Sequence, residues 1–154
     1  MDNALVVLVI EDNLGDFHLL EESFAEQSVP AKLFLVPNAV QAFSFLSRQG
    51  QFAGMPKPDL VLLDLNLPII RGHKVLDIIR STEEWARLPV IVLSSSTLKK
   101  DREECARFQV EAHLVKPSHY DGYLELAKEI AVCCKRIASM RERRRTASMA
   151  KSVP

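Results

Sequence analysis

Carboxylates, a hydroxyl and a lysine follow four apolar runs of this sequence, each at the point where the run ends. Glu11 and Asp12 follow the run 5–10, Asp64 follows 60–63, Ser94 follows 90–93, and Lys116 follows 112–115. If each run is a strand of one parallel sheet, these side chains converge at the carboxyl edge of that sheet. Such a set of groups suits the handling of a phosphoryl group and its metal ion.

The acids of this cluster predict a site for a divalent cation. The adjacent carboxylates of Glu11 and Asp12 repel each other, and Asp64 adds a third negative charge. Oxygen-only ligands suit Mg²⁺, which takes one or two carboxylates and keeps several waters. We therefore expect Asp12 and Asp64 to bind Mg²⁺ directly, Glu11 to act through water, and the backbone carbonyl of Asn66 to add a ligand.

Lys116 and Ser94 complete the expected site. Lys116 supplies a positive charge for one phosphoryl oxygen, and Ser94 supplies a donor for a second. Taken singly, each residue of the cluster has an ordinary structural interpretation as a helix start, a turn or a loop residue. Their joint placement at the ends of four apolar runs favours the functional interpretation.

Apolar runs and helical patterns alternate five times along the chain. This alternation predicts an α/β, doubly wound, five-stranded parallel sheet with helices on both faces. The expected strands cover residues 5–10, 32–36, 59–63, 89–93 and 112–115. The expected helices cover roughly 15–28, 39–48, 72–80, 98–108 and 120–145, and the Gly- and Pro-rich residues 49–58 form a surface loop.

Length and composition predict one domain over residues 1–145 and a disordered tail over 146–154. The chain has 154 residues, of which 47% are hydrophobic, so it can bury a sizeable core. No apolar stretch reaches the ~18 residues needed to cross a membrane, and the N-terminus lacks a signal-peptide pattern. We therefore expect a cytoplasmic protein, with Cys105, Cys133 and Cys134 as reduced, buried thiols.

The cluster and its order along the chain resemble the receiver domain of two-component response regulators over residues 3–130. The motifs that carry the resemblance are Glu11-Asp12, Asp64 in Leu-Leu-Asp-Leu-Asn-Leu-Pro68, Gly72, Ser94 after Pro89-Val-Ile-Val-Leu, and Lys116-Pro117. The resemblance implies a flavodoxin-like fold and a switch rather than an enzyme. It also implies that a sensor histidine kinase phosphorylates Asp64.

The same resemblance implies roles for the other site residues. Glu11 and Asp12 would be the metal-binding acid pair, Ser94 the switch hydroxyl and Lys116 the phosphate-binding lysine, with a cis bond before Pro117. His113 stands three residues before the lysine, where many receivers carry an aromatic residue that moves with the switch hydroxyl. An imidazole could rotate similarly, so His113 is the second expected switch residue.

Three further features are similar to the small single-domain regulators that partner phytochrome-type histidine kinases. They are the Glu-Asp-Asn-Leu-Gly-Asp16 start, the Asp-Leu-Asn-Leu-Pro68 motif and the loop at 49–58. A regulator of this type carries no DNA-binding domain and acts through its own surface.

Two other classes of protein fit parts of the pattern. A Mg²⁺-dependent phosphohydrolase also uses an aspartyl nucleophile on an α/β sheet. Such enzymes of the haloacid dehalogenase type usually carry a second aspartate two residues after the first, where this chain has Asn66. A flavodoxin-like cofactor binder would need a phosphate-cradling loop, which residues 12–16 do not supply. The missing proton donor favours a switch.

The last predicted helix is longer than the strands that it covers. One stripe on it alternates steps of three and four, the spacing of a coiled-coil seam: Tyr123, Leu126, Ile130, Cys133, Ile137 and Met140. Ile137 and Met140 are expected beyond the cover of their own sheet, which predicts a homodimer through this helix. The alternative is that the first part faces the core and the rest frays.

The end of the chain is basic, although the whole chain has no net charge. Seven basic residues and one acid, Glu142, lie between Lys135 and Lys151. Such a run suits the negative end of a helix dipole. Binding to nucleic acid or anionic lipid is the alternative.

Overall fold

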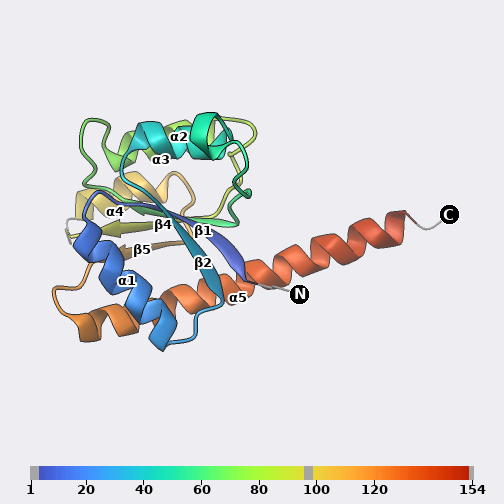
Figure 1. Ribbon diagram of the computed structural model, residues 1–154. Coiled ribbons are helices and arrows are strands. Elements are labelled where there is room, and N and C mark those ends of the chain that lie inside the picture. The colour runs from blue at the N-terminus through green and yellow to red at the C-terminus, as the bar shows by residue number, and fades with distance from the viewer. Residues whose placement is uncertain (1–3, 96–98, 153–154) are drawn as a thin grey trace.

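The computed structural model describes residues 4–95 and 99–152. Its five strands form one parallel sheet in the order β2-β1-β3-β4-β5 (Figure 1). The strands are β1 (Leu5–Ile10), β2 (Ala31–Val36), β3 (Leu60–Asp64), β4 (Val90–Ser94) and β5 (Ala112–Val115). The strand order reverses between β1 and β3, which confirms the doubly wound fold and places a ligand crevice at their carboxyl ends.

Helices cover both faces of this sheet. They are α1 (Leu14–Glu26), α2 (Ala39–Leu46), α3 (Gly72–Ser81), α4 (Lys99–Ala106) and α5 (Tyr120–Lys151), with a 3₁₀ turn η1 (Gly50–Phe52) in the predicted loop. Figure 1 shows α1 and α5 on one face and α2, α3 and α4 on the other. All five predicted helices are therefore present, with ends that differ by a few residues except for α5.

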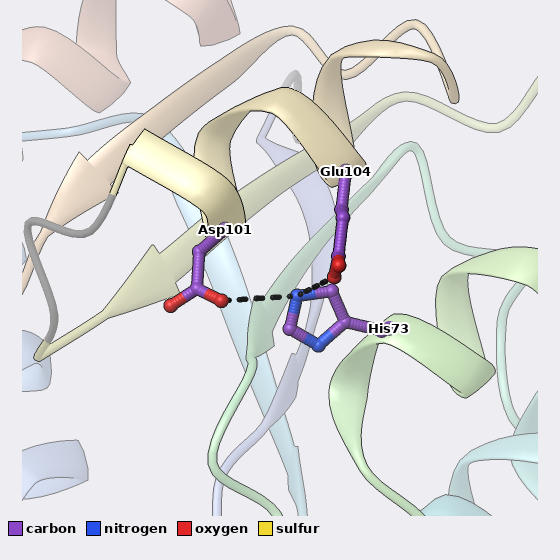
Figure 2. Close-up of side chains that lie close together, drawn as sticks. All are labelled: His73, Asp101 and Glu104. Atoms are coloured by element: carbon purple, nitrogen blue, oxygen red, sulfur yellow. Dashed lines mark ion pairs between the residues drawn. The ribbon is translucent and has the colours of Figure 1, made fainter.

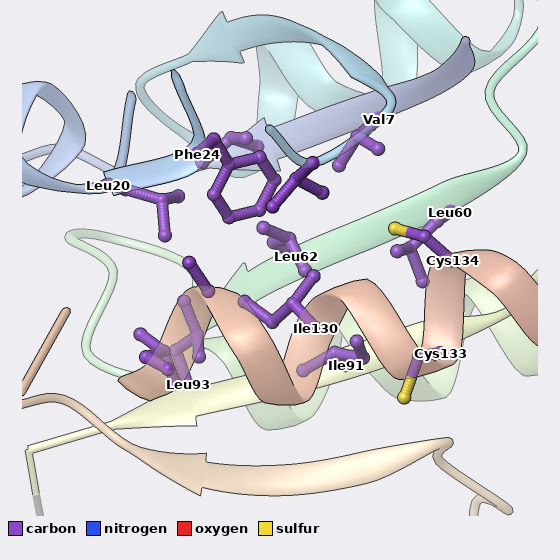
Figure 3. Close-up of a cluster of buried hydrophobic side chains, with 14 of the residues drawn as sticks. Val7, Leu20, Phe24, Leu60, Leu62, Ile91, Leu93, Ile130, Cys133 and Cys134 are labelled. Carbon is purple, nitrogen blue, oxygen red and sulfur yellow. The ribbon is translucent and has the colours of Figure 1, made fainter. Parts of the chain in front are cut away.

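Two apolar clusters hold the layers together, one on each face. On β3, Leu60 and Leu62 face the α1 and α5 side, whereas Val61 and Leu63 face the α2, α3 and α4 side. Figure 3 shows Leu62 between Phe24 of α1 and Ile130 of α5. Burial on both faces explains the uninterrupted apolar runs of the sequence.

Two local features fix the loops that carry the site. The side chain of Asn13 accepts a hydrogen bond from the backbone N–H of Asp16 (2.9 Å), so α1 begins directly after the acid pair. At Gly72 an added Cβ would lie 2.5 Å from the Cα of Leu65 and 2.6 Å from the carbonyl oxygen of Asp64. Only glycine therefore lets the start of α3 pack this closely against the end of β3.

Helix α5 differs from its prediction in two ways. It ends at Lys151 rather than near 145, so residues 146–151 are helical and the predicted disordered tail is wrong for them. Residues 123–151 contain neither glycine nor proline, so nothing in the sequence stops the helix. Residues 153–154 of that tail lie outside the described part of the chain.

The second correction concerns Ile137, which was expected beyond the cover of its own sheet. Its side chain is buried, with 8% exposure, in the same cluster as Leu5 and Leu60. Nearby, Arg141 of α5 pairs with Asp59 before β3 (3.2 Å), which brings this part of the helix onto the sheet edge. Met140 is 47% exposed, so the predicted exposure holds for Met140 alone.

None of the helices within the described residues is both long and apolar enough to cross a lipid bilayer.

Candidate functional site

The strand register brings the predicted site residues to one edge of the sheet. Leu63 pairs with Ile10, so Asp64 and Glu11 follow at neighbouring strand ends. Ser94 is the last residue of β4 and pairs with Val115, which directly precedes Lys116. The backbone N–H of Lys116 donates to the carbonyl oxygen of Ser94 (2.8 Å). The convergence predicted from the sequence is therefore present in the fold.

Three carboxylates lie together at this edge. One oxygen from each of Glu11, Asp12 and Asp64 lies within 4.8 Å of the other two. Glu11 and Asp64 are buried, whereas Asp12 is exposed to solvent. An all-oxygen set with one open side fits a hard divalent cation that keeps part of its water shell.

Lys116 neutralises part of this charge from inside the protein. Its Nζ lies 3.1 Å from Oδ2 of Asp64 and 3.1 Å from Oδ2 of Asp16, and it also contacts Oε1 of Glu11. Burial disfavours the charged ammonium, but the carboxylates outweigh it, and the pKa of Lys116 is raised. The lysine therefore stays charged and ready to contact an added anion.

Asp16 is a site residue that the sequence reasoning missed. It lies in the first turn of α1, a helix that starts directly after Glu11 and Asp12. The side chain of Asn13 holds its backbone N–H at the helix start. A helix that begins next to an acid pair could have indicated that its first-turn carboxylate faces the same pocket.

Glu11 has a carboxyl group with a raised pKa. Burial and a hydrogen bond with the neighbouring Asp64 raise the pKa of Glu11 from 4.5 to about 7, although Lys116 opposes the shift. In metal-free protein, Glu11 therefore holds a proton over part of the neutral range. A bound cation would favour the ionised carboxylate and release that proton.

The two oxygens of Asp64 have different partners. Oδ1 accepts a hydrogen bond from the backbone N–H of Asn66 (2.9 Å), and Oδ2 accepts one from Nζ of Lys116 (3.1 Å). The side-chain amide of Asn66 donates to Oγ of Ser95 (3.0 Å), which links the loops after β3 and β4. These contacts hold the carboxylate of Asp64 in one orientation.

The two predicted switch residues lie on neighbouring strands. Ser94 is buried at the end of β4, beside the strand that carries Asp64. His113 pairs in register with Val92, so it faces the side of the sheet that α4 covers. Both ring nitrogens of His113 are buried and make no hydrogen bond within the described residues. Burial and the charge of Arg102 lower the pKa of His113, so this imidazole favours its neutral form.

The bond before Pro117 differs from its prediction. Every peptide bond between described residues is trans, so the predicted cis bond is wrong. In this arrangement Pro117 packs against Gly122 in the first turn of α5, where an added Cβ would clash with the proline ring. This packing accommodates the isomer that an X–Pro bond already prefers by about 0.5–1 kcal/mol.

Comparisons with known proteins identify the family of this chain. The family model described as the response regulator receiver domain matches residues 7–128. Response regulator Rcp1 of Synechocystis sp. is 30% identical over 125 residues, which cover 81% of this chain and 85% of that protein. A structure of Rcp1 in its Mn²⁺-bound form matches with a TM-score of 0.75.

Two further solved structures are similar. The phosphorylated cyanobacterial phytochrome response regulator RcpA is 32% identical with a TM-score of 0.76, over 82% of this chain and 91% of that one. Response regulator RPA3017, in red light signalling of R. palustris, is 36% identical with a TM-score of 0.76, over 82% of this chain and 90% of that one. Family match, fold and acidic cluster agree, and the chain belongs to the receiver domain family of response regulators, divalent-metal-binding phosphorelay switches that work with sensor kinases.

Proposed function

We propose that this protein is a response regulator in which Asp64 accepts a phosphoryl group from a histidine kinase. One observation carries the proposal. The carboxylate of Asp64 lies beside those of Glu11 and Asp12 and is held by Lys116 and by the N–H of Asn66. This arrangement joins a nucleophile, a cation site and a fixed positive charge.

The proposed chemistry needs little covalent help from the protein. An oxygen of Asp64 attacks the phosphorus of a kinase phosphohistidine, the phosphorus–nitrogen bond breaks, and the leaving imidazole takes up a proton. Lys116, already 3.1 Å from Oδ2 of Asp64, neutralises charge on the phosphoryl oxygens during the transfer. The N–H of Asn66 keeps the carboxylate oriented.

We propose Mg²⁺ as the divalent ion of this site. Asp12, Asp64 and the backbone carbonyl of Asn66 would hold it directly, and Glu11 would hold it through water. The three clustered carboxylates support this choice because hard oxygen donors suit Mg²⁺. When bound, the ion would neutralise charge between the acceptor carboxylate and the incoming phosphoryl group.

The switch would start at Lys116 and Ser94. A phosphoryl group on Asp64 would compete with the carboxylates of Glu11 and Asp16 for Lys116 and would recruit the hydroxyl of Ser94. Two charge-assisted hydrogen bonds at about 1.5–3 kcal/mol each approach the ~5.5 kcal/mol needed to move a population from 1:99 to 99:1.

Helix α4 is the element that we expect to move when Asp64 is phosphorylated. The chain after Ser94 leads into α4, and His113 faces this helix from the sheet. Among the residues of α4, Cys105 alone is buried. A helix with so little buried surface can shift at low free-energy cost.

We also propose the partners. The similarity to RcpA, a phytochrome response regulator, and to RPA3017, in red light signalling, favours a phytochrome-type sensor kinase. Residues 1–145 would act as one receiver unit in the cytoplasm. A homodimer would form through the exposed end of α5.

The phosphoryl acceptor can be tested by intact mass after incubation with a small acyl-phosphate donor. Wild type and the control Asp77→Asn, a change on the surface of α3, should gain one phosphoryl group only when Mg²⁺ is present. Asp64→Asn should gain none. Equal labelling of Asp64→Asn would place the acceptor elsewhere. Continuous phosphate release without a labelled protein would favour the phosphohydrolase alternative.

A further inference from the structure

A second group of metal-ligating side chains lies between α3 and α4 (Figure 2). His73 comes from the first turn of α3, and Asp101 and Glu104 come from α4. One ligand atom of each residue lies within 4.8 Å of the other two. This group shares no residue with the acidic cluster around Asp64.

The distances within this group differ from those of hydrogen bonds. Nε2 of His73 lies 3.5 Å from Oδ1 of Asp101 and 3.4 Å from Oε2 of Glu104. A charge-assisted N–H···O bond measures about 2.7–2.9 Å. Two atoms bound to one tetrahedral Zn²⁺ at bond lengths of about 2.0–2.1 Å lie ~3.3–3.4 Å apart. The observed spacing therefore fits atoms that share a metal ion.

The imidazole offers a second, independent observation. Nε2 of His73 is buried and makes no hydrogen bond to any residue in 4–95 or 99–152. Figure 2 shows this nitrogen directed towards both carboxylates of α4. A buried nitrogen without a hydrogen-bond partner is costly unless a proton or a metal ion lies between it and the carboxylates.

The fold presents these ligands before any ion binds. The close packing of Gly72 on Leu65 fixes the start of α3, and therefore the position of His73. Asp101 and Glu104 are three residues apart, so they share one face of α4. The side chains of His73 and Asp101 are 22% and 20% exposed, and that of Glu104 is 42% exposed, which leaves the site open to water on one side.

We propose that His73, Asp101 and Glu104 bind one Zn²⁺ ion, with water as the fourth ligand. One imidazole and two carboxylates suit a borderline ion such as Zn²⁺, whereas the all-oxygen cluster at Asp64 suits Mg²⁺. Because Cys105 is the one buried residue of α4, the bound ion would be one of the main contacts that hold α4 against α3. Zn²⁺ would therefore restrain the helix that the phosphorylation switch is proposed to move.

Calorimetry of Zn²⁺ binding to the full chain, with Mg²⁺ in excess, tests the site. Wild type should bind one Zn²⁺, and His73→Ala should lose at least about 100-fold in affinity. Asp101→Asn and Glu104→Gln should each lose about tenfold or more. The matched control is His18→Ala, which removes an exposed histidine 3.7 Å from Glu21 on α1 and should bind Zn²⁺ as wild type does.

Co²⁺ provides an independent measure of the ligands. Wild type should show the visible absorption of tetrahedral Co²⁺, and His73→Gln, which keeps a polar side chain of similar size, should lose it. Zn²⁺ should also slow amide hydrogen exchange over 99–106 in wild type and not in His73→Gln. Cooperative urea unfolding of both proteins with the same midpoint in the absence of Zn²⁺ would show that the variant is folded.

Three results would overturn the proposal. Unchanged Zn²⁺ affinity in His73→Ala and His73→Gln would place the ion elsewhere. No Zn²⁺ binding by wild type would mean that His73, Asp101 and Glu104 do not form a zinc site. A strong near-ultraviolet Co²⁺–thiolate band would assign the ion to cysteines. None of these results depends on whether Asp64 accepts a phosphoryl group.

Discussion

At the residue scale, the site depends on how one lysine and several carboxylates share charge. Lys116 contacts Glu11, Asp16 and Asp64 and acts as an internal cation. An added phosphoryl group must draw this lysine away from its present partners. The free energy of the switch is therefore a difference between two well-paired states.

Glu11 predicts a pH dependence of stability in metal-free protein. Its pKa is raised from 4.5 to about 7, so between these values the folded state binds more protons than the unfolded state. Stability should therefore fall as pH rises through this window, by about 3 kcal/mol in total. Urea unfolding in the presence of a chelator, from pH 4.5 to 7.5, measures this loss.

The Glu11→Gln variant is the control for this measurement. The lowered pKa of His113 makes the free energy of unfolding rise with pH, which is the opposite direction. This contribution is present in both proteins, so the difference between their pH slopes comes from Glu11. Saturating Mg²⁺ should reduce the difference in pH slope between wild type and Glu11→Gln, because the ion favours the ionised carboxylate of Glu11. Identical slopes in the two proteins without metal would contradict the raised pKa.

The sequence predicted those site residues that directly follow a strand, because a strand end has a fixed place at the sheet edge. Asp16 was missed because its contact with Lys116 depends on the direction in which α1 leaves that edge. The pairing of His73 with Asp101 and Glu104 was missed for a similar reason. It depends on how α3 packs against α4, which no local pattern encodes.

At the element scale, the close approach of α3 to β3 fixes the loop that carries Asp64. Gly72→Ala should destabilise the protein by about 1–3 kcal/mol, because the new Cβ would meet backbone atoms of Leu65 and Asp64. It should also slow phosphoryl labelling of Asp64. Urea unfolding and intact mass measure the two effects.

Gly54→Ala is the matched control for this change. An added Cβ at Gly54 meets no atom within 4 Å among the described residues. This variant should unfold and become labelled as wild type does. If Gly72→Ala matched Gly54→Ala in both measurements, the close packing of α3 would not control the site.

The order and type of the elements followed from alternation of apolar runs and helical patterns. The extent to which α5 packs on its own sheet could not be predicted in this way. The same stripe of residues suits a helix packed on its own core and a helix packed on a second copy of itself. Burial of Ile137 shows that the packed part continues further than expected. Residues 142–151 are all exposed, and this last part of α5 extends away from the sheet (Figure 1).

At the scale of the whole molecule, this extension is the surface through which we propose that two copies of the chain associate. Met140, just before the extension, and Met149, on it, are 47% and 65% exposed. A short helix without tertiary contacts is only marginally stable in water. A second copy of the extension would cover these methionines and support the helix.

The dimer predicts a change of mass in sedimentation equilibrium. Wild type should sediment as a dimer, and the double variant Met140→Asp with Met149→Asp should sediment as a monomer. The control Val40→Asp alters an exposed apolar residue of α2 on the other face of the sheet and should remain dimeric. Ile137→Asp is unsuitable because it would disrupt the core. A monomeric wild type, or an unchanged double variant, would contradict this interface.

Chemical reduction of the phosphorylated protein locates the phosphoryl group on the chain. Protein phosphorylated in the presence of Mg²⁺ is treated with borohydride, which reduces an aspartyl phosphate to homoserine, and the peptides are then sequenced by mass spectrometry. We expect homoserine at position 64. Homoserine at Asp12 or Asp16 instead, or labelled protein without any homoserine, would contradict this expectation.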